Sequence, residues 1–123
     1  MRSFDHDPDR KMKPQWQTVS QCVPDSPAAD AIVLTLDIDW ACDEVLADCI
    51  DLIEGAGAPA TWFVTHDTPL LERLRANDNF ELGIHPNFNP LIEGNGTSAD
   101  RVIDEILAIV PEAVSVRSHS LLQ

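Results

Sequence analysis

The sequence lacks any long apolar segment, because no hydrophobic run approaches the roughly 20 residues that span a bilayer. It also lacks the apolar core of a secretory signal near its N-terminus. From these two absences we expect no membrane insertion and a cytoplasmic localisation.

Cysteine is scarce as well. Cys22, Cys42 and Cys49 are odd in number and contain no C-x-x-C pair, so we expect neither a disulfide framework nor a cysteine metal site. Cys42 and Cys49 lie seven positions apart on a predicted helix. We therefore expect them to be small buried residues.

Basic residues are few. The chain has eight Lys and Arg against 21 Asp and Glu, a net charge of −13, and residues 31–123 hold only four of the eight. Such an acidic body repels a phosphate backbone, so we expect no nucleic-acid partner. A neutral or cationic substrate, or a bound divalent cation, fits this charge better.

The length of 123 residues corresponds to one domain. Residues 1–30 carry four prolines among charged and small polar residues without a sustained period. We interpret them as a flexible or loosely docked arm, and residues 31–123 as the folded domain.

Within the domain, short apolar runs alternate with helical stripes. The first run, from residue 31 to the carboxylates at 37 and 39, is typical of a strand buried on both faces. Further runs predict strands at 60–65, 80–84 and 113–116, and stripes predict helices at 43–54, 68–76 and 99–110, with a loop at 86–97. This order predicts an α/β fold with a parallel sheet and right-handed crossovers.

Each predicted strand ends in polar side chains. Because the carboxyl ends of parallel strands meet at one rim, where α/β folds bind ligands, we expect these side chains to gather there. They are Asp37 and Asp39, then Thr65, His66 and Asp67, then His85, and finally Arg117 and His119.

The two aspartates at this rim suggest a cation. Asp37 and Asp39 lie two positions apart and therefore point to the same side of their strand, where they repel each other unless a cation lies between them. A carboxylate with imidazoles from other strand ends is typical of a catalytic zinc or iron site.

Four segments at these strand ends resemble those of the polysaccharide deacetylases (carbohydrate esterase family 4, the NodB homology domain), in particular the branch linked to surface-polysaccharide loci. The resemblance spans about residues 31–121. Its segments are Thr35-Leu36-Asp37-Ile38-Asp39, Trp62-Phe63-Val64-Thr65, Gly83-Ile84-His85-Pro86 and Val116-Arg117-Ser118-His119.

The resemblance implies a distorted, incomplete (β/α) barrel and a metal-dependent removal of N-acetyl groups from a carbohydrate. It implies that Asp37 is the general base and Arg117 the residue that orients it. It also implies that Asp39 and His85 bind a divalent metal, for which we expect zinc.

The third metal ligand departs from the family pattern. The family's second histidine lies four positions after the first, and this sequence has Asn89 there. An amide oxygen is a poorer zinc ligand than imidazole. His119 is the other candidate, and the sequence leaves the choice between Asn89 and His119 open.

The family's barrel has about seven strands, whereas this sequence predicts four. We therefore expect a truncated form, inactive alone or completed by a second copy or another chain that covers the exposed sheet edge.

Two other functions compete. A haloacid-dehalogenase-like phosphatase also places D-x-D after its first strand. In that function Asp37 would be the nucleophile and Asp39 the acid and base, and Thr65 would bind the phosphate. Such a site needs a lysine, but no lysine follows Lys13. The second alternative is a non-catalytic domain that binds metal or sugar, or assembles with another chain.

Overall fold

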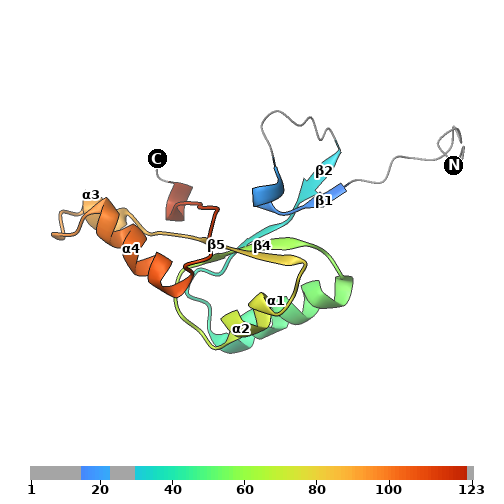
Figure 1. Cartoon of the computed structure of the whole chain (residues 1–123). Helices are drawn as coiled ribbons and strands as arrows, with labels where there is room; N and C mark the ends of the chain where they lie inside the picture. Colours follow the sequence, from blue (N-terminus) through green and yellow to red (C-terminus); the bar gives the residue numbers. More distant parts are fainter. Residues whose placement is uncertain (1–14, 23–29, 122–123) are drawn as a thin grey trace, which may run out of the picture.

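The structure is a computed structural model that describes residues 15–22 and 30–121. Figure 1 shows its elements along the chain. They are β1 (Gln15–Gln17), the 3-10 turn η2 (Val19–Gln21), β2 (Ala31–Val33), β3 (Thr35–Asp37), α1 (Asp43–Ala56), β4 (Ala60–Val64), α2 (Leu70–Arg75), β5 (Phe80–Ile84), α3 (Asn89–Ile92), α4 (Ala99–Ile109) and η3 (His119–Leu121).

The main sheet is parallel and has the order β3-β4-β5. Its fourth position is only a bridge between Ile84 and Val116, so the strand predicted at 113–116 does not form as a full strand. Ala113 N–H still closes the turn after α4, and Val114 is 77% exposed, with no strand paired beyond it among residues 15–22 and 30–121. The α/β class with a parallel sheet is confirmed, matching a partial (β/α) fold.

The first predicted strand is divided. Residues 31–33 form β2, which pairs with β1 in a separate two-stranded sheet, and residues 35–37 form β3. The prediction that this strand is buried on both faces was wrong, because Ile32 is 38% exposed. The division occurs at Leu34, whose carbonyl accepts from Thr61 N–H of the main sheet. Apolar composition alone could not show that the chain changes sheets there.

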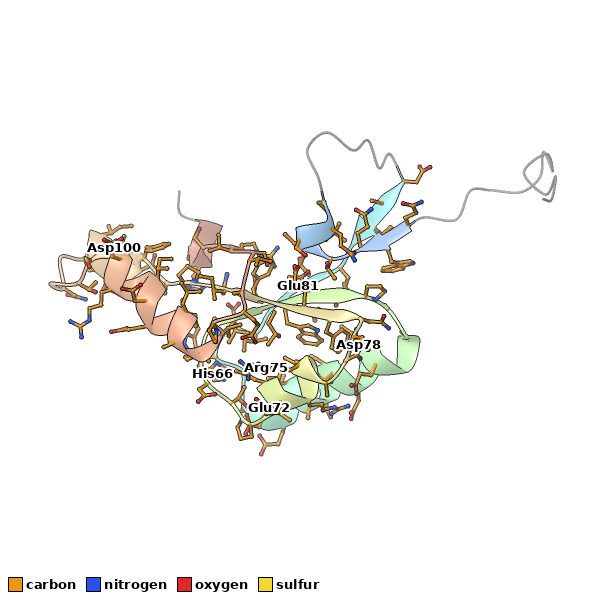
Figure 2. All side chains as sticks on the ribbon, in the orientation of Figure 1. His66, Glu72, Arg75, Asp78, Glu81 and Asp100 are labelled. Atoms are coloured by element: carbon orange, nitrogen blue, oxygen red, sulfur yellow. The ribbon has the colours of Figure 1, made fainter. Side chains whose placement is uncertain are left out.

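Part of the predicted arm lies against the sheet. Val19 N–H donates to Thr61 Oγ1 at 2.9 Å, and Ser20 N–H donates to the Glu81 carboxylate at 3.0 Å. Figure 2 shows Glu81 on the side of the sheet toward these residues. Residues 1–14 and 23–29 of the arm lie outside the described residues, and the boundary at residue 30 stays a prediction.

Alternation along the strands separates the core from the site. In β4, Ala60, Trp62 and Val64 face the core, while Thr61 and Phe63 face the other way. Helices α1 and α2 cover the core face of the sheet (Figure 1). The register then places a second set on the opposite face, here called the site face: Thr35, Asp37, Thr61, Phe63, Glu81 and Gly83.

The helices largely follow their sequence signals. Acidic residues occupy the first turn of α1, and Gly57 ends it with a left-handed φ of 67°. The cysteine prediction was wrong for Cys42, which is exposed at the start of α1, while Cys49 is half-buried and all three cysteines are free thiols. No helix among the described residues has both the length and the apolar composition to cross a membrane.

The segment from 86 to 98 carries the chain from β5 to α4. It contains α3, a single turn that the sequence analysis took for loop. Ser98 begins α4 as predicted, because its side chain accepts from Arg101 N–H at 3.2 Å. Helix α4 lies beyond the end of β5, beside the rim where the polar residues gather (Figure 1).

Candidate metal and catalytic site

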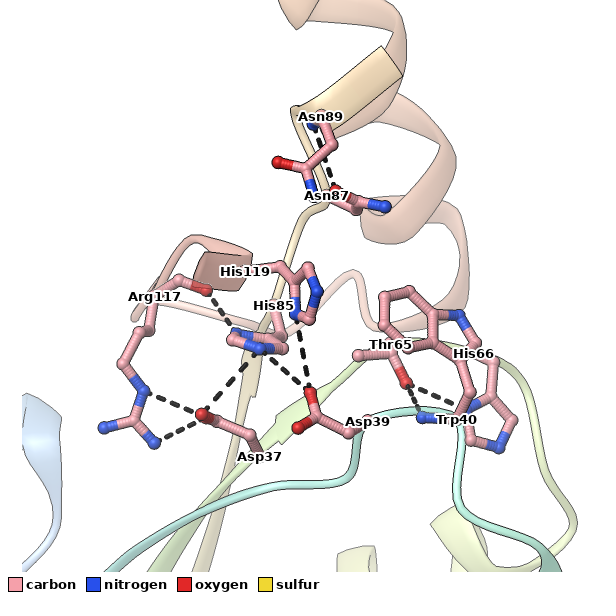
Figure 3. A network of polar contacts seen from close by, with 10 residues as sticks. All are labelled: Asp37, Asp39, Trp40, Thr65, His66, His85, Asn87, Asn89, Arg117 and His119. Atoms are coloured by element: carbon pink, nitrogen blue, oxygen red, sulfur yellow. Dashed lines mark hydrogen bonds and ion pairs between the residues drawn. The ribbon is translucent and has the colours of Figure 1, made fainter. Parts of the chain in front are cut away.

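The structure brings five of the six predicted site residues together at the carboxyl ends of the strands (Figure 3). Asp37 ends β3 and Asp39 follows it, His85 follows β5, and Arg117 and His119 follow the bridge at Val116. Parallel pairing explains this convergence, because all these strands reach the same rim.

Three of these side chains form a group that can hold a metal ion. One ligand atom from each of Asp39, His85 and His119 lies within 4.8 Å of the others. His85 Nε2 is 3.2 Å and His119 Nδ1 is 3.6 Å from Asp39 Oδ1. A carboxylate and two imidazoles match the donor set that catalytic zinc sites use, so these residues fit the group that the resemblance implies.

His85 is fixed by its backbone neighbour. Its ring is 3% exposed, and its Nδ1 lies 2.6 Å from the carbonyl oxygen of Arg117. A carbonyl can only accept, so Nδ1 carries a hydrogen, and Nε2 is the ring atom that faces the carboxylates. Metal-binding histidines are oriented in this way by a second hydrogen bond.

Asn89, the alternative third ligand, lies apart from this group at the start of α3 (Figure 3). Its backbone N–H donates to Asn87 Oδ1 at 3.0 Å, which turns the chain into α3. His119 instead has its ring 5.4 Å from that of His85, in an edge-to-face arrangement. The geometry therefore places His119, not Asn89, beside Asp39 and His85.

Arg117 is the partner of Asp37. Its Nε donates to Asp37 Oδ1 at 2.9 Å and its Nη1 donates to Thr35 Oγ1 at 3.0 Å. The guanidinium also lies over the Phe63 ring, 4.5 Å from the centroid. These contacts fix one oxygen of Asp37, while its Oδ2 faces His85 Nε2 at 3.7 Å.

Trp40 also lies at this rim, although it was not among the predicted site residues. Asp39 and Trp40 have φ angles of 41° and 56°, and Ala41 N–H closes this turn on the Ile38 carbonyl at 2.8 Å. The backbone N–H of Trp40 donates to Thr65 Oγ1, which also lies 2.9 Å from His66 Nδ1. A left-handed turn at two residues without glycine has no clear sequence signal.

Comparison with known families agrees with this geometry. Residues 34–123 match the profile of a family described as WbmS-like polysaccharide deacetylase. The chain belongs to this family. A search of curated proteins finds no significant match.

The chain is also similar to a solved structure. With 53% identity and a TM-score of 0.83, it resembles a Bordetella bronchiseptica protein described as a candidate polysaccharide deacetylase involved in O-antigen biosynthesis. The match covers 89% of this chain and 46% of that protein. The chain thus spans less than half the length of this neighbour.

Proposed function

We propose that this chain carries the metal-binding half of a deacetylase site that removes acetyl groups from N-acetylated sugars of a polysaccharide. The observation that carries the proposal is the position of Asp37 beside the group formed by Asp39, His85 and His119. A base next to a metal-binding group is the arrangement that hydrolysis of an amide requires.

In this proposal the residues of the chain divide the work. Asp39, His85 and His119 hold a divalent cation, which when bound supplies Lewis acidity that polarises the acetamide carbonyl. Asp37 accepts the proton of the attacking water through Oδ2, because Oδ1 is occupied by Arg117. Arg117 keeps the Asp37 side chain in one orientation and Phe63 supports Arg117 from below.

Zinc is the cation we propose. Two imidazole nitrogens and one carboxylate oxygen are preferred zinc donors, and magnesium or calcium prefers oxygen donors alone. The neighbourhood is also acidic, since Asp37 adds a second carboxylate near His85.

The other two functions are less well supported. The family membership favours neither a phosphatase nor a non-catalytic domain. The phosphatase further requires a lysine at the site, and no lysine follows Lys13 in the sequence.

We also propose that a second copy of this chain or a partner chain packs on the open edge of the main sheet. Val114 and Val116 are 77% and 59% exposed beside the last position of this sheet. Such a contact would cover them. We propose the cytoplasm as the location of this assembly.

Zinc binding tests the metal site directly. Competition with a chromophoric zinc chelator should show one site in the 123-residue chain, weakened in Asp39→Ala and in His85→Ala. His66→Ala is the matched control, because His66 lies at the same rim and bonds to Thr65 instead of the group. Equal zinc affinity in all four proteins would refute the site.

Deacetylation is tested separately. Release of acetate from an N-acetylglucosamine oligomer should require zinc and Asp37, measured for the chain alone and mixed with the unmatched segment of the Bordetella homologue. Activity in the mixture that disappears in Asp37→Asn supports the proposal. Zinc binding without acetate release in either sample favours a non-catalytic metal-binding domain.

A further inference from the structure

Trp40 is an exposed aromatic residue held next to the metal-binding group. It is 47% exposed, and its ring meets the His119 ring edge to face, with centroids 5.1 Å apart. The backbone N–H of Trp40 donates to Thr65 Oγ1 at 2.9 Å, which fixes the main chain at this point. Figure 3 shows Trp40 and Thr65 on the side of Asp39 away from Arg117.

The backbone of Trp40 is costly for such a residue. Its φ of 56° lies in the left-handed region, which is unfavourable for a residue with a Cβ. Glycine or asparagine would adopt this turn more easily, and a half-exposed indole gains only part of the stabilisation of a buried one. Strain of this kind concentrates where a side chain serves a ligand.

A cavity opens beside Trp40. Its volume is about 510 Å³, within the range of small-molecule sites, and it reaches from His85 to α4. Val102, Ile106 and Ile109 of α4 give it an apolar wall, and Asn95 and Thr97 add polar groups.

The charges around this cavity are paired. Arg101 Nε donates to Glu105 at 3.0 Å, so the one arginine of the lining is paired with an acidic neighbour that also lines the cavity. The cavity therefore offers an aromatic face, apolar side chains and amide or hydroxyl groups. An anionic ligand finds no uncompensated cation among these residues.

We propose that Trp40 is a stacking platform for one neutral pyranose ring of the substrate, seated in the cavity between Trp40 and α4. The apolar C–H face of a pyranose matches an indole, and its hydroxyl groups match Asn95 and Thr97. Because His85 lines the cavity and belongs to the metal-binding group, a ring seated there brings its acetamide next to that group. This inference rests on the proposed deacetylase function and adds the place of the sugar.

The indole N–H signals of the chain provide the test. The three tryptophans are Trp40, Trp16 at 45% exposure on β1, and Trp62 at 1% exposure in the core. In ¹H–¹⁵N spectra, titration with tri-N-acetylchitotriose should shift the Trp40 indole signal in a saturable way. The Trp16 and Trp62 signals should stay in place, with assignments taken from Trp40→Phe and Trp16→Phe.

Affinity variants complete the test. By backbone amide shifts, Trp40→Ala should bind the trisaccharide about tenfold more weakly, while Trp16→Ala, an equally exposed tryptophan, should bind as the parent chain does. Zinc affinity should change less than about twofold in Trp40→Ala. A large loss of zinc affinity would overturn the platform and make Trp40 a positioning residue for His119, and an unchanged sugar affinity would also overturn it.

The outcomes separate this inference from the proposed function. If acetate is released but the Trp40 signal does not move, the platform is refuted and the deacetylase stands. If the Trp40 signal shifts and no acetate is released under any condition, the sugar site stands and the reaction is refuted. Equal shifts of Trp16 and Trp40 would indicate non-specific contact and overturn the platform.

Discussion

Arg117 Nε donates to Oδ1 of Asp37 at 2.9 Å across 80 positions of the sequence. This bond joins the first strand of the main sheet to the chain that follows its last position. The same arginine uses its backbone carbonyl to fix His85. One residue therefore orients both the proposed base and a proposed metal ligand.

Arg117→Lys should lower deacetylation roughly ten- to hundredfold, because a lysine cannot bond Asp37 and Thr35 together as the guanidinium does. Zinc affinity should change much less, since the backbone carbonyl that fixes His85 remains. Acetate release and chelator competition measure the two effects. Arg73→Lys is the control and should leave both unchanged, because Arg73 of α2 pairs with Asp51 and Glu54 of α1, away from the site face. Equal activity of the two variants would contradict this role.

The third metal ligand can be identified by a paired substitution. His119→Ala should weaken zinc binding more than roughly tenfold, because it removes a donor that lies 3.6 Å from Asp39 Oδ1. Asn89→Ala should have little effect, because Asn89 lies at the start of α3, outside the group. Chelator competition distinguishes them, and the reverse order of effects would return the ligand to Asn89.

Gly83 allows the site face to pack. A Cβ at this position would lie 2.6 Å from Ser115 Oγ and 2.7 Å from Phe63 Cε1. Gly83→Ala should therefore lower the free energy of unfolding by about 1–3 kcal/mol. It should also disturb Arg117, which lies over Phe63.

Gly55→Ala is the matched control for that substitution. Gly55 lies in α1 with no atom within 4 Å of the added Cβ, so alanine should stabilise the chain by about 0.5–1 kcal/mol. Urea unfolding of both variants shows whether each substitution lowers or raises the free energy of unfolding. Equal stability of the two would show that β5 and Phe63 rearrange at little cost.

Glu112 predicts a pH dependence of stability. Burial raises the pKa of this carboxyl. The hydrogen bond from Arg75 Nε at 2.7 Å, the bond from the backbone N–H of Glu112 and the charge of Arg75 together lower the pKa by more than burial raises it. The net pKa therefore lies below its ordinary value of 4.5. The stabilisation of the folded state by ionised Glu112 is therefore complete above about pH 4.5. It is lost as the pH falls through the pKa that Glu112 has in the folded state.

Glu112→Gln should cost less than about 1 kcal/mol near neutral pH, because the Glu112 side chain is 46% exposed. The difference from the parent should vanish in acid, which urea unfolding at neutral and acidic pH would show. Glu105→Gln, in the more exposed pair with Arg101, should cost less. A cost that persists in acid would mean that the Glu112 charge is not its source.

Much of this molecule was predictable from local patterns. The period of α1 and α4, the Ser98 cap and the β5 run at 80–84 all appear where the sequence placed them, because each depends on neighbours a few positions away. The convergence of Asp37, Asp39 and His85 followed from parallel order alone.

The remaining features depend on contacts between distant segments. The first strand divides at Leu34 because the Leu34 carbonyl bonds to Thr61 of the main sheet, whereas the residues before Leu34 pair with β1. The choice of His119 over Asn89 depends on how far α3 and η3 turn from the sheet. Trp40 is placed by Thr65, 25 positions away, which no periodicity reveals.

The alternation along β4 and β5 also limits how the family can diverge. Phe63 and Gly83 point to the site, and their neighbours Trp62 and Leu82 point to the helices. A single inserted or deleted residue within either strand would exchange these sets, turning core side chains toward the site and site side chains toward the core. Length changes should therefore be confined to the connections between strands, while the chemistry of the site can vary by substitution alone.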